Sequence, residues 1–285
     1  MGTTSTAVLA CIDGSPSLIP VCDYAMWAGQ KTGLAIKLLH TVSTPQISGG
    51  DLSGSIGLGS RETLLSELAK VEQKHSKLQR DNGREILQQA EQYCTERGTS
   101  SLSSLQRHGS LAETLLDLEP ATELLVLGLR GEAHADNHKG IGRKIESVLR
   151  SIHRPTLIVN QSFSQPKNIL LAYDGSNSAK KALHYICQSP LFSDTCCHAV
   201  FSGDHQEANE HLQHAKNQLE HASIAFKTAL LDDRLDKSIV DYQEQHAIDL
   251  VVMGAFSHGK LRDLFLGSIT TKVLKNSARP MLFLR

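Results

Sequence analysis

The stretch AVLACIDGSPS at residues 7–17 returns in similar form as NILLAYDGSNS at residues 168–178. Each copy is an apolar run of strand length followed by Asp-Gly-Ser. The apolar run predicts a buried strand, and Asp-Gly-Ser is typical of a turn from a strand into a helix. The recurrence of the pattern indicates that the chain contains one structural unit twice.

A second repeat lies toward the end of each unit. The segment LLVLG ends at Gly128, and its counterpart LVVMG ends at Gly254. Further along, GRKIESVLRSIHRPTLIV at 142–159 resembles GSITTKVLKNSARPMLFL at 267–284. Each unit therefore begins with a strand and Asp-Gly-Ser, and ends with a glycine, a helix, Arg-Pro and a strand.

These repeats predict two tandem domains, at residues 1–159 and 168–285, joined by the polar linker NQSFSQPK at 160–167. Strands and helices alternate within each domain, and the late strands are continuous apolar runs, as in a parallel sheet that is covered on both faces. The predicted fold class is α/β, with two tandem Rossmann-like domains, each a five-stranded parallel sheet with helices on both faces. The predicted strands are 7–12, 35–41, 102–108, 124–128 and 156–159, then 168–173, 196–201, 224–230, 250–254 and 281–284. The predicted helices are 16–32, 60–97, 111–118 and 142–152, then 177–188, 205–222, 235–246 and 267–277. In the long helix we expect Leu64, Leu68, Val71 and Leu78 to form a packing face.

Composition sets limits on the function. The chain has 285 residues, 40% of them hydrophobic and 21% charged, which is typical of a soluble globular protein. A net charge of -1 favours neither nucleic acid nor a membrane surface as a partner. None of the six cysteines forms a C-x-x-C pair, so we expect reduced thiols and a cytoplasmic location.

Asp13 and Asp174 each follow the first strand of their domain. In an open α/β sheet, ligands bind beyond the carboxyl ends of the strands, where the strand order reverses. An aspartate at that place can accept hydrogen bonds from an adenine amino group or a ribose hydroxyl. The alternative is that Asp-Gly-Ser only shapes the turn and caps the following helix.

The stretch GAFSHGKLRDLFLGS, residues 254–268, raises the question of a phosphate-binding loop. A P-loop requires Ser or Thr after the lysine to hold magnesium, and Leu261 stands there instead. Gly267 and Ser268, however, open the last predicted helix. The exposed N–H groups and the dipole at such a helix start form an anion site, so the stretch predicts a phosphate site of another kind.

Two units that begin with Asp-Gly-Ser and close with a glycine, a helix, Arg-Pro and a strand, with Gly-Ser before the helix in the second unit, resemble the tandem universal stress proteins of bacteria. The resemblance covers essentially the whole chain. It implies a Rossmann-like five-stranded sheet per domain and pairing of the domains through their last strands. The ATP-binding branch of that family carries Gly-x2-Gly-x9-Gly-Ser/Thr, and the second domain matches it except at one position, where Ser257 replaces the second glycine.

The resemblance places Asp174 on the adenine side and the backbone near Ser202 opposite the base, with Gly259 restoring flexibility near the phosphates. The residues that we assign to the second-domain site are Asp174, Ser202, Gly254, Ser257, Gly259, Gly267, Ser268 and Ile269.

The first domain departs further from the motif. Ten residues instead of nine precede its last glycine, and Arg143 stands where Ser or Thr is expected. Arg143 would either pair with a phosphate or fill the site itself. We expect a degenerate site, whose candidate residues are Asp13, Gly128, Gly131, Gly142 and Arg143.

The sequence therefore predicts a cytoplasmic stress-response protein that binds ATP or a related adenine nucleotide, with or without magnesium, mainly in its second domain. We find no set of residues spaced as a catalytic triad or as a resident metal site. Two alternatives stay open: a nucleotide-free dimerising scaffold, and a weak ATPase. The apolar last strands RPTLIV and RPMLFL predict that the two domains pair within the chain. Association of two chains into a homodimer is left open.

Overall fold

A computed structural model describes residues 6–42, 58–131, 143–202, 205–232, 235–254 and 268–285. The strands are β1 (Ala7–Cys11), β2 (Ala35–Val42), β3 (Leu102–His108), β4 (Thr122–Gly128), β5 (Thr156–Val159), β6 (Asn168–Ala172), β7 (Cys196–Ser202), β8 (Ala225–Leu231), β9 (Leu250–Gly254) and β10 (Met281–Leu284). The α-helices are α1 (Leu18–Thr32), α2 (Leu58–Glu96), α3 (Leu111–Leu118), α4 (Arg143–Ser151), α5 (Asn177–Gln188), α6 (His205–His221), α7 (Leu235–Gln245) and α8 (Ser268–Asn276). Two 3₁₀ turns are η1 (Glu119–Ala121) and η3 (Pro190–Phe192).

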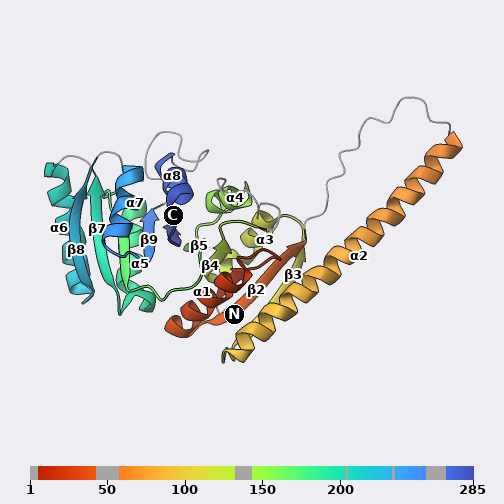
Figure 1. Ribbon diagram of the computed structural model, residues 1–285, viewed down its shortest axis with the longest axis horizontal. Helices are drawn as coiled ribbons and strands as arrows, with labels where there is room; N and C mark the ends of the chain where they lie inside the picture. Colours follow the sequence, from red (N-terminus) through yellow and green to blue (C-terminus); the bar gives the residue numbers. More distant parts are fainter. Residues whose placement is uncertain (1–5, 43–57, 132–142, 203–204, 233–234, 255–267) are drawn as a thin grey trace.

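All ten strands form one sheet, in the order β3-β2-β1-β4-β5-β10-β9-β6-β7-β8. Within each half of this order, neighbouring strands are parallel. The halves meet at β5 and β10, which are antiparallel and pair Leu157 with Leu282 and Ile158 with Met281. Figure 1 shows the two groups of strands side by side, with β5 and β10 between them. Because the junction is antiparallel, the carboxyl ends of the two sets of strands lie on opposite edges of the sheet.

A hydrophobic core lies on each face of the sheet, and both cores cross the junction. On one face, α1, α2, α5 and α6 cover a core that includes Leu157 and Leu282. On the other face, α4, α7 and α8 cover a core that includes Ile158 and Met281. Successive residues of a strand point to opposite faces, so each last strand contributes to both cores. The two halves therefore share their interior.

The predicted strands and helices are all present, with bounds within two residues of those expected. The α/β fold with two groups of five parallel strands is confirmed. The two sheets are continuous with each other because the last strands pair directly.

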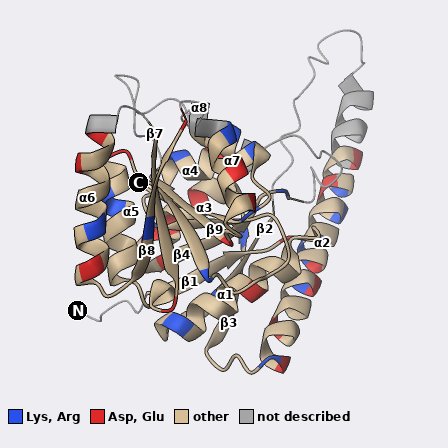
Figure 2. Ribbon diagram, turned by 60° about the vertical axis from the view of Figure 1, so that its left-hand side comes forward, with Lys and Arg blue, Asp and Glu red and all other residues tan. Residues whose placement is uncertain are grey.

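The long helix α2 differs from its prediction in one respect. Leu68, Val71 and Leu78 are 43%, 65% and 60% exposed, so the expected packing face is wrong at these three positions, and the Leu64 side chain lies outside the described ones. The part that packs on β2, β3 and α1 lies further along, from Gly83 to Cys94. Figure 1 shows the rest of α2 reaching away from the sheet, and Figure 2 shows basic and acidic residues interspersed along it. None of the helices in the described ranges combines the length and hydropathy needed to cross a membrane.

The connection between β5 and β6 packs against both halves. The Phe163 ring lies 4.9 Å from that of Tyr24 on α1, edge to face, and 6.5 Å from that of Trp27. Asn160 donates hydrogen bonds to the carbonyls of Ser277 and Arg279, at 2.9 and 3.0 Å. This segment is thus part of the packed structure.

Candidate functional site

The strand order reverses between β6 and β9, because β7 and β8 lie beyond β6 and β10 lies beyond β9. Asp174 follows β6, Gly254 ends β9 and Ser202 ends β7. Parallel strands end at the same edge of their sheet, so the structure brings these three predicted residues to one edge. We call this edge the second crevice. The corresponding edge of the first half, at the ends of β1 and β4, is the first crevice.

Asp174 shapes the turn that leads into α5. Its Oδ1 accepts a hydrogen bond from the backbone N–H of Ser176 at 3.0 Å, and the Ser176 hydroxyl oxygen accepts one from the N–H of Ala179 at 3.2 Å. Ser176 is therefore the N-cap of α5. Burial, with the Asp174 charge next to it, raises the pKa of Tyr173 to about 12. The helix-cap role considered for Asp-Gly-Ser is thus present, and it places the half-buried Asp174 carboxylate at the crevice.

Gly254 has a packing role that the sequence did not predict. A Cβ placed on it would lie 2.5 Å from Oγ of Ser178 and 2.7 Å from the carbonyl carbon of the same residue. Only glycine lets the start of α5 approach the end of β9 this closely. The first half repeats the arrangement, since a Cβ on Gly128 would lie 2.5 Å from Cβ of Ser17. The small residues at 17 and 178 in the quoted repeat were the available signal.

The Ser202 side chain is directed to the neighbouring strand. Its hydroxyl donates a hydrogen bond to the carbonyl of Asp232, just after β8, at 2.9 Å. That bond holds the end of β7 against the end of β8. The hydroxyl proton of Ser202 is thus used within the protein, and the resemblance implied that the backbone at this position faces the base.

The remaining predicted residues of the second crevice are covered only in part. Ser268 and Ile269 open α8, whose backbone is described. Ser257, Gly259 and Gly267 lie outside the described residues. Helix α8 connects the end of β9 to the start of the parallel strand β10, and β9 is next to β6 in the sheet. The first N–H groups of α8 therefore lie at the same edge as Asp174.

In the first crevice, the chain after β4 lies against the aspartate. Asp13 accepts a hydrogen bond from the N–H of Ser15 at 3.1 Å through Oδ1, and a Cβ on Gly131 would lie 2.8 Å from its Oδ2. The Ser17 hydroxyl also donates to the carbonyl of Arg130 at 3.3 Å. The chain just after β4 therefore lies against Asp13 and Ser17, at the ends of β1 and β4. Of the other candidates, Arg143 opens α4 and Gly142 lies outside the described residues.

A cluster of aromatic and imidazole rings lies beside Asp174, and the sequence analysis missed it. The rings are those of Tyr173, Phe201, His211 and His214. Tyr173 directly follows β6, Phe201 lies near the end of β7, and His211 and His214 lie on α6. Sequence spacing gave no signal, because contacts between a helix and the edge of a sheet depend on how the helix is rotated.

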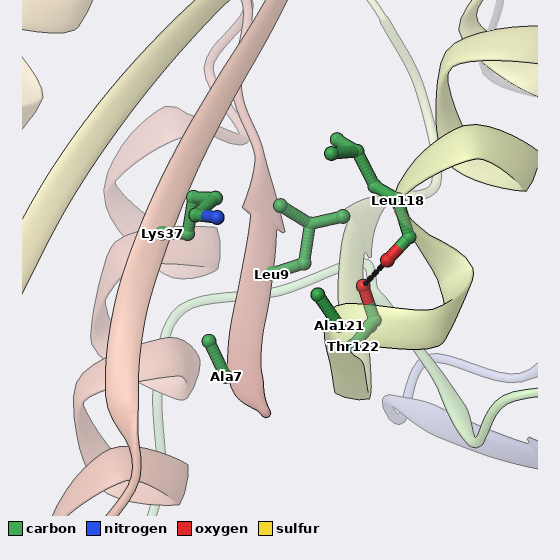
Figure 3. A pocket seen from close by; sticks show the side chains of 6 residues that line it. All are labelled: Ala7, Leu9, Lys37, Leu118, Ala121 and Thr122. Carbon is green, nitrogen blue, oxygen red and sulfur yellow. Dashed lines mark hydrogen bonds between the residues drawn. The ribbon is translucent and has the colours of Figure 1, made fainter. Parts of the chain in front are cut away.

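A small hollow lies away from both crevices. It is lined by Ala7, Leu9, Lys37, Leu118, Ala121 and Thr122. Figure 3 shows these side chains around the start of β1, where the Thr122 hydroxyl donates to the carbonyl of Leu118 at 2.9 Å. The hollow has room for about one water molecule. It lies toward the start of β1, whereas Asp13 follows the end of that strand, and it is no candidate for a nucleotide site.

Comparison with known proteins agrees with this architecture. The sequence pattern of the Universal stress protein family matches residues 5–160 and 198–285. The universal stress protein Slr1230 of Synechocystis is 34% identical over 284 residues, which cover 98% of this chain and 99% of that protein. A universal stress protein from Archaeoglobus fulgidus has a similar structure, with a TM-score of 0.76, 19% identity and 99% of each chain covered. A putative universal stress protein from Pseudomonas aeruginosa follows, with a TM-score of 0.63, 16% identity and coverage of 99% of this chain and 92% of that one. The chain therefore belongs to the universal stress protein family.

Proposed function

We propose that this protein binds ATP or a related adenine nucleotide in the second crevice and acts as a regulatory binding module. The observation that carries the proposal is the meeting of Asp174, Gly254 and the start of α8 at the reversal point of the strand order. The start of a helix attracts phosphate through its exposed N–H groups and its dipole. A carboxylate on the neighbouring strand end offers acceptors for an amino group or a hydroxyl, so the crevice suits both ends of a nucleotide.

The two halves would differ in their roles. We assign residues 1–159 and 168–285 as two domains, joined at 160–167, of which the second binds the nucleotide. In the first crevice, the chain at Gly131 lies so close to Asp13 that a Cβ would overlap its carboxylate, which favours a degenerate site there. Magnesium would accompany the phosphates rather than reside in the protein, and binding alone requires no catalytic group. The six free cysteines suit the reducing cytoplasm.

The test is the nucleotide content of the purified protein. The protein is denatured, and released nucleotides are identified by chromatography and mass, for the wild type and for Ser268→Arg. That substitution copies Arg143 of the first half to the matching position of the second. We expect ATP or a related adenine nucleotide from the wild type and none from Ser268→Arg.

Arg143→Ser is the matched control in the first half, and it should leave the nucleotide content unchanged. Absence of nucleotide from every variant, with no binding when ATP is added, would favour the nucleotide-free scaffold. Turnover of added ATP that Asp174→Ala abolishes would favour a weak ATPase instead.

A further inference from the structure

The ring cluster beside Asp174 forms an aromatic corner of the second crevice, made of Tyr173, Phe201 and His211. The His211 ring stacks on Phe201, with 5.4 Å between the ring centroids and 29° between the planes. The His211 and Tyr173 rings are nearly perpendicular, with 6.3 Å between their centroids. Tyr173 and Phe201 are 2% and 5% exposed, whereas His211 is only half-buried. The corner therefore has a buried aromatic floor and a partly accessible imidazole over it.

His211 lies directly against the backbone next to the crevice aspartate. Gly175 has a φ of +70°, and a Cβ at this position would overlap the His211 ring. Glycine is thus required both by the backbone conformation and by the imidazole that occupies the space of a side chain. The ring reaches from α6 to the residue that follows Asp174, so it forms a wall of the second crevice.

The first half provides an internal comparison for the strand positions. Ile12 donates its backbone N–H to the carbonyl of Leu39, and Tyr173 donates in the same way to Val200, each at 2.9 Å. By this register, Ile12 corresponds to Tyr173, and His40 corresponds to Phe201. The first half therefore has an aliphatic side chain in place of Tyr173 and an imidazole in place of Phe201.

The helices correspond as well. The N–H of Thr99 bonds to the carbonyl of Cys94 after α2, as the N–H of Ile224 bonds to that of Leu219 after α6. Counting back from these matched ends pairs Ile86 with His211. Ile86 is 6% exposed and belongs to the hydrophobic core. A ring over the crevice is thus a feature of the second half, where the nucleotide motif is nearly complete.

We propose that His211 is a specificity-determining residue that stacks on the base of the bound nucleotide. This inference rests on the proposed function. In the proposed pose the phosphates lie at the start of α8. A nucleotide that extends from there along the edge of the sheet, in the strand order β9-β6-β7, passes Asp174 and reaches the end of β7. There it meets the half-buried imidazole of His211. Stacking of a base on an aromatic ring contributes binding energy that a ligand without a base cannot obtain.

The test compares His211→Ile, which copies Ile86, with the wild type. Calorimetry measures binding of ATP and of inorganic triphosphate, which has the phosphates but no base. We expect ATP to bind about tenfold more weakly to His211→Ile, since stacking of one base has an effect of this order. Triphosphate should bind equally to both proteins. His211→Phe, which keeps a flat ring, should retain most of the ATP affinity.

His221→Ile is the control on the same helix, because His221 is exposed and lies at the far end of α6. It should leave ATP binding unchanged. A second readout uses only the wild type for binding. ATP, but not triphosphate, should shift the NMR resonance of the His211 ring protons. That resonance is assigned by its absence from the spectrum of His211→Ile. Equal ATP affinity of His211→Ile and the wild type would overturn the inference and leave the proposed function standing. Failure of the wild type to bind ATP at all would overturn both.

Discussion

At the scale of single residues, His198 on β7 is an imidazole enclosed in the protein, with 1% of its surface exposed. Its Nδ1 lies 3.1 Å from the hydroxyl of Tyr242, and its Nε2 has no hydrogen-bond partner among the described residues. Burial lowers the pKa of His198, and the charges of Lys227 and His246 lower it further. The folded protein therefore holds this ring in the neutral form.

This burial predicts a pH-dependent stability. The folded pKa of His198 lies below the unfolded value of about 6.5, so the unfolded chain binds the proton more readily. The contribution is fully present above about pH 6.5 and is lost as the pH falls toward the folded pKa. Urea unfolding between neutral and mildly acidic pH should show a falling free energy of unfolding. His198→Phe should make that fall shallower, and the exposed His184→Phe should not. An equal fall in all three proteins would contradict this assignment.

Sequence alone placed Asp174 and Gly254 at one edge of the sheet, because both follow strands whose apolar runs are unambiguous. It did not reveal that Ser178 packs directly against Gly254, or that the His211 ring packs against Gly175. Both contacts depend on the distance and rotation of a helix relative to the sheet, and these follow from packing throughout the half. The order of the elements predicts the place of the candidate site, but not which side chains border it.

At the scale of elements, Gly83 lies where α2 contacts β2 and β3. It is buried, and a Cβ on it would lie 2.6 Å from Nδ1 of His40, which is itself buried. Gly83→Ala would gain up to about 1 kcal/mol in helix propensity. Overlap with a buried ring costs about 1–3 kcal/mol. We therefore expect a net loss of stability, measured by chemical denaturation.

Gln88→Ala on the same helix is the matched control. Gln88 is exposed, so its replacement should change the free energy of unfolding by about 0.5 kcal/mol or less. An increase in stability for Gly83→Ala would mean that propensity outweighs the close approach.

Helices and strands were predictable because their periodicity is local. For α2, the periodicity predicted the helix correctly but not the part of it that packs on the sheet. The period of the apolar residues identified a helix over 60–97, close to the observed Leu58–Glu96. The same period made Leu68, Val71 and Leu78 look like a packing face, although they are exposed. Periodicity identifies one side of a helix, but it does not say how much of the helix lies over the sheet.

At the scale of the whole molecule, the shared cores predict that the two halves unfold together. Leu282 is 2% exposed and pairs with Leu157 across the junction. Leu282→Ala should lower the free energy of unfolding by about 2–5 kcal/mol. Trp27, the single tryptophan, lies in the first half, whereas Leu282 lies in the second. The fluorescence of Trp27 and the far-UV circular dichroism should therefore shift to the same lower midpoint.

Leu230→Ala is the control at the outer edge of the sheet, where Leu230 is 36% exposed on β8. It should shift both midpoints far less. A Trp27 transition that stays in place while the dichroism separates into two steps would show that the halves unfold independently.

Pairing of the two halves was predictable from the apolar last strands, RPTLIV and RPMLFL. The register of Leu157 with Leu282, and the merging of the cores, were not. Register between segments far apart in the chain depends on which side chains interlock, and several offsets of a short apolar strand satisfy the same pattern.

The antiparallel junction of β5 and β10 has a consequence for behaviour on dilution. Two separate chains that met through these strands would come apart as their concentration fell. Here the partner strand is on the same chain, and a short segment keeps its effective concentration near the millimolar range. The ratio of the two halves is then one to one at any level of expression. One half can therefore change at its crevice without losing its partner, as long as it keeps its side of the junction.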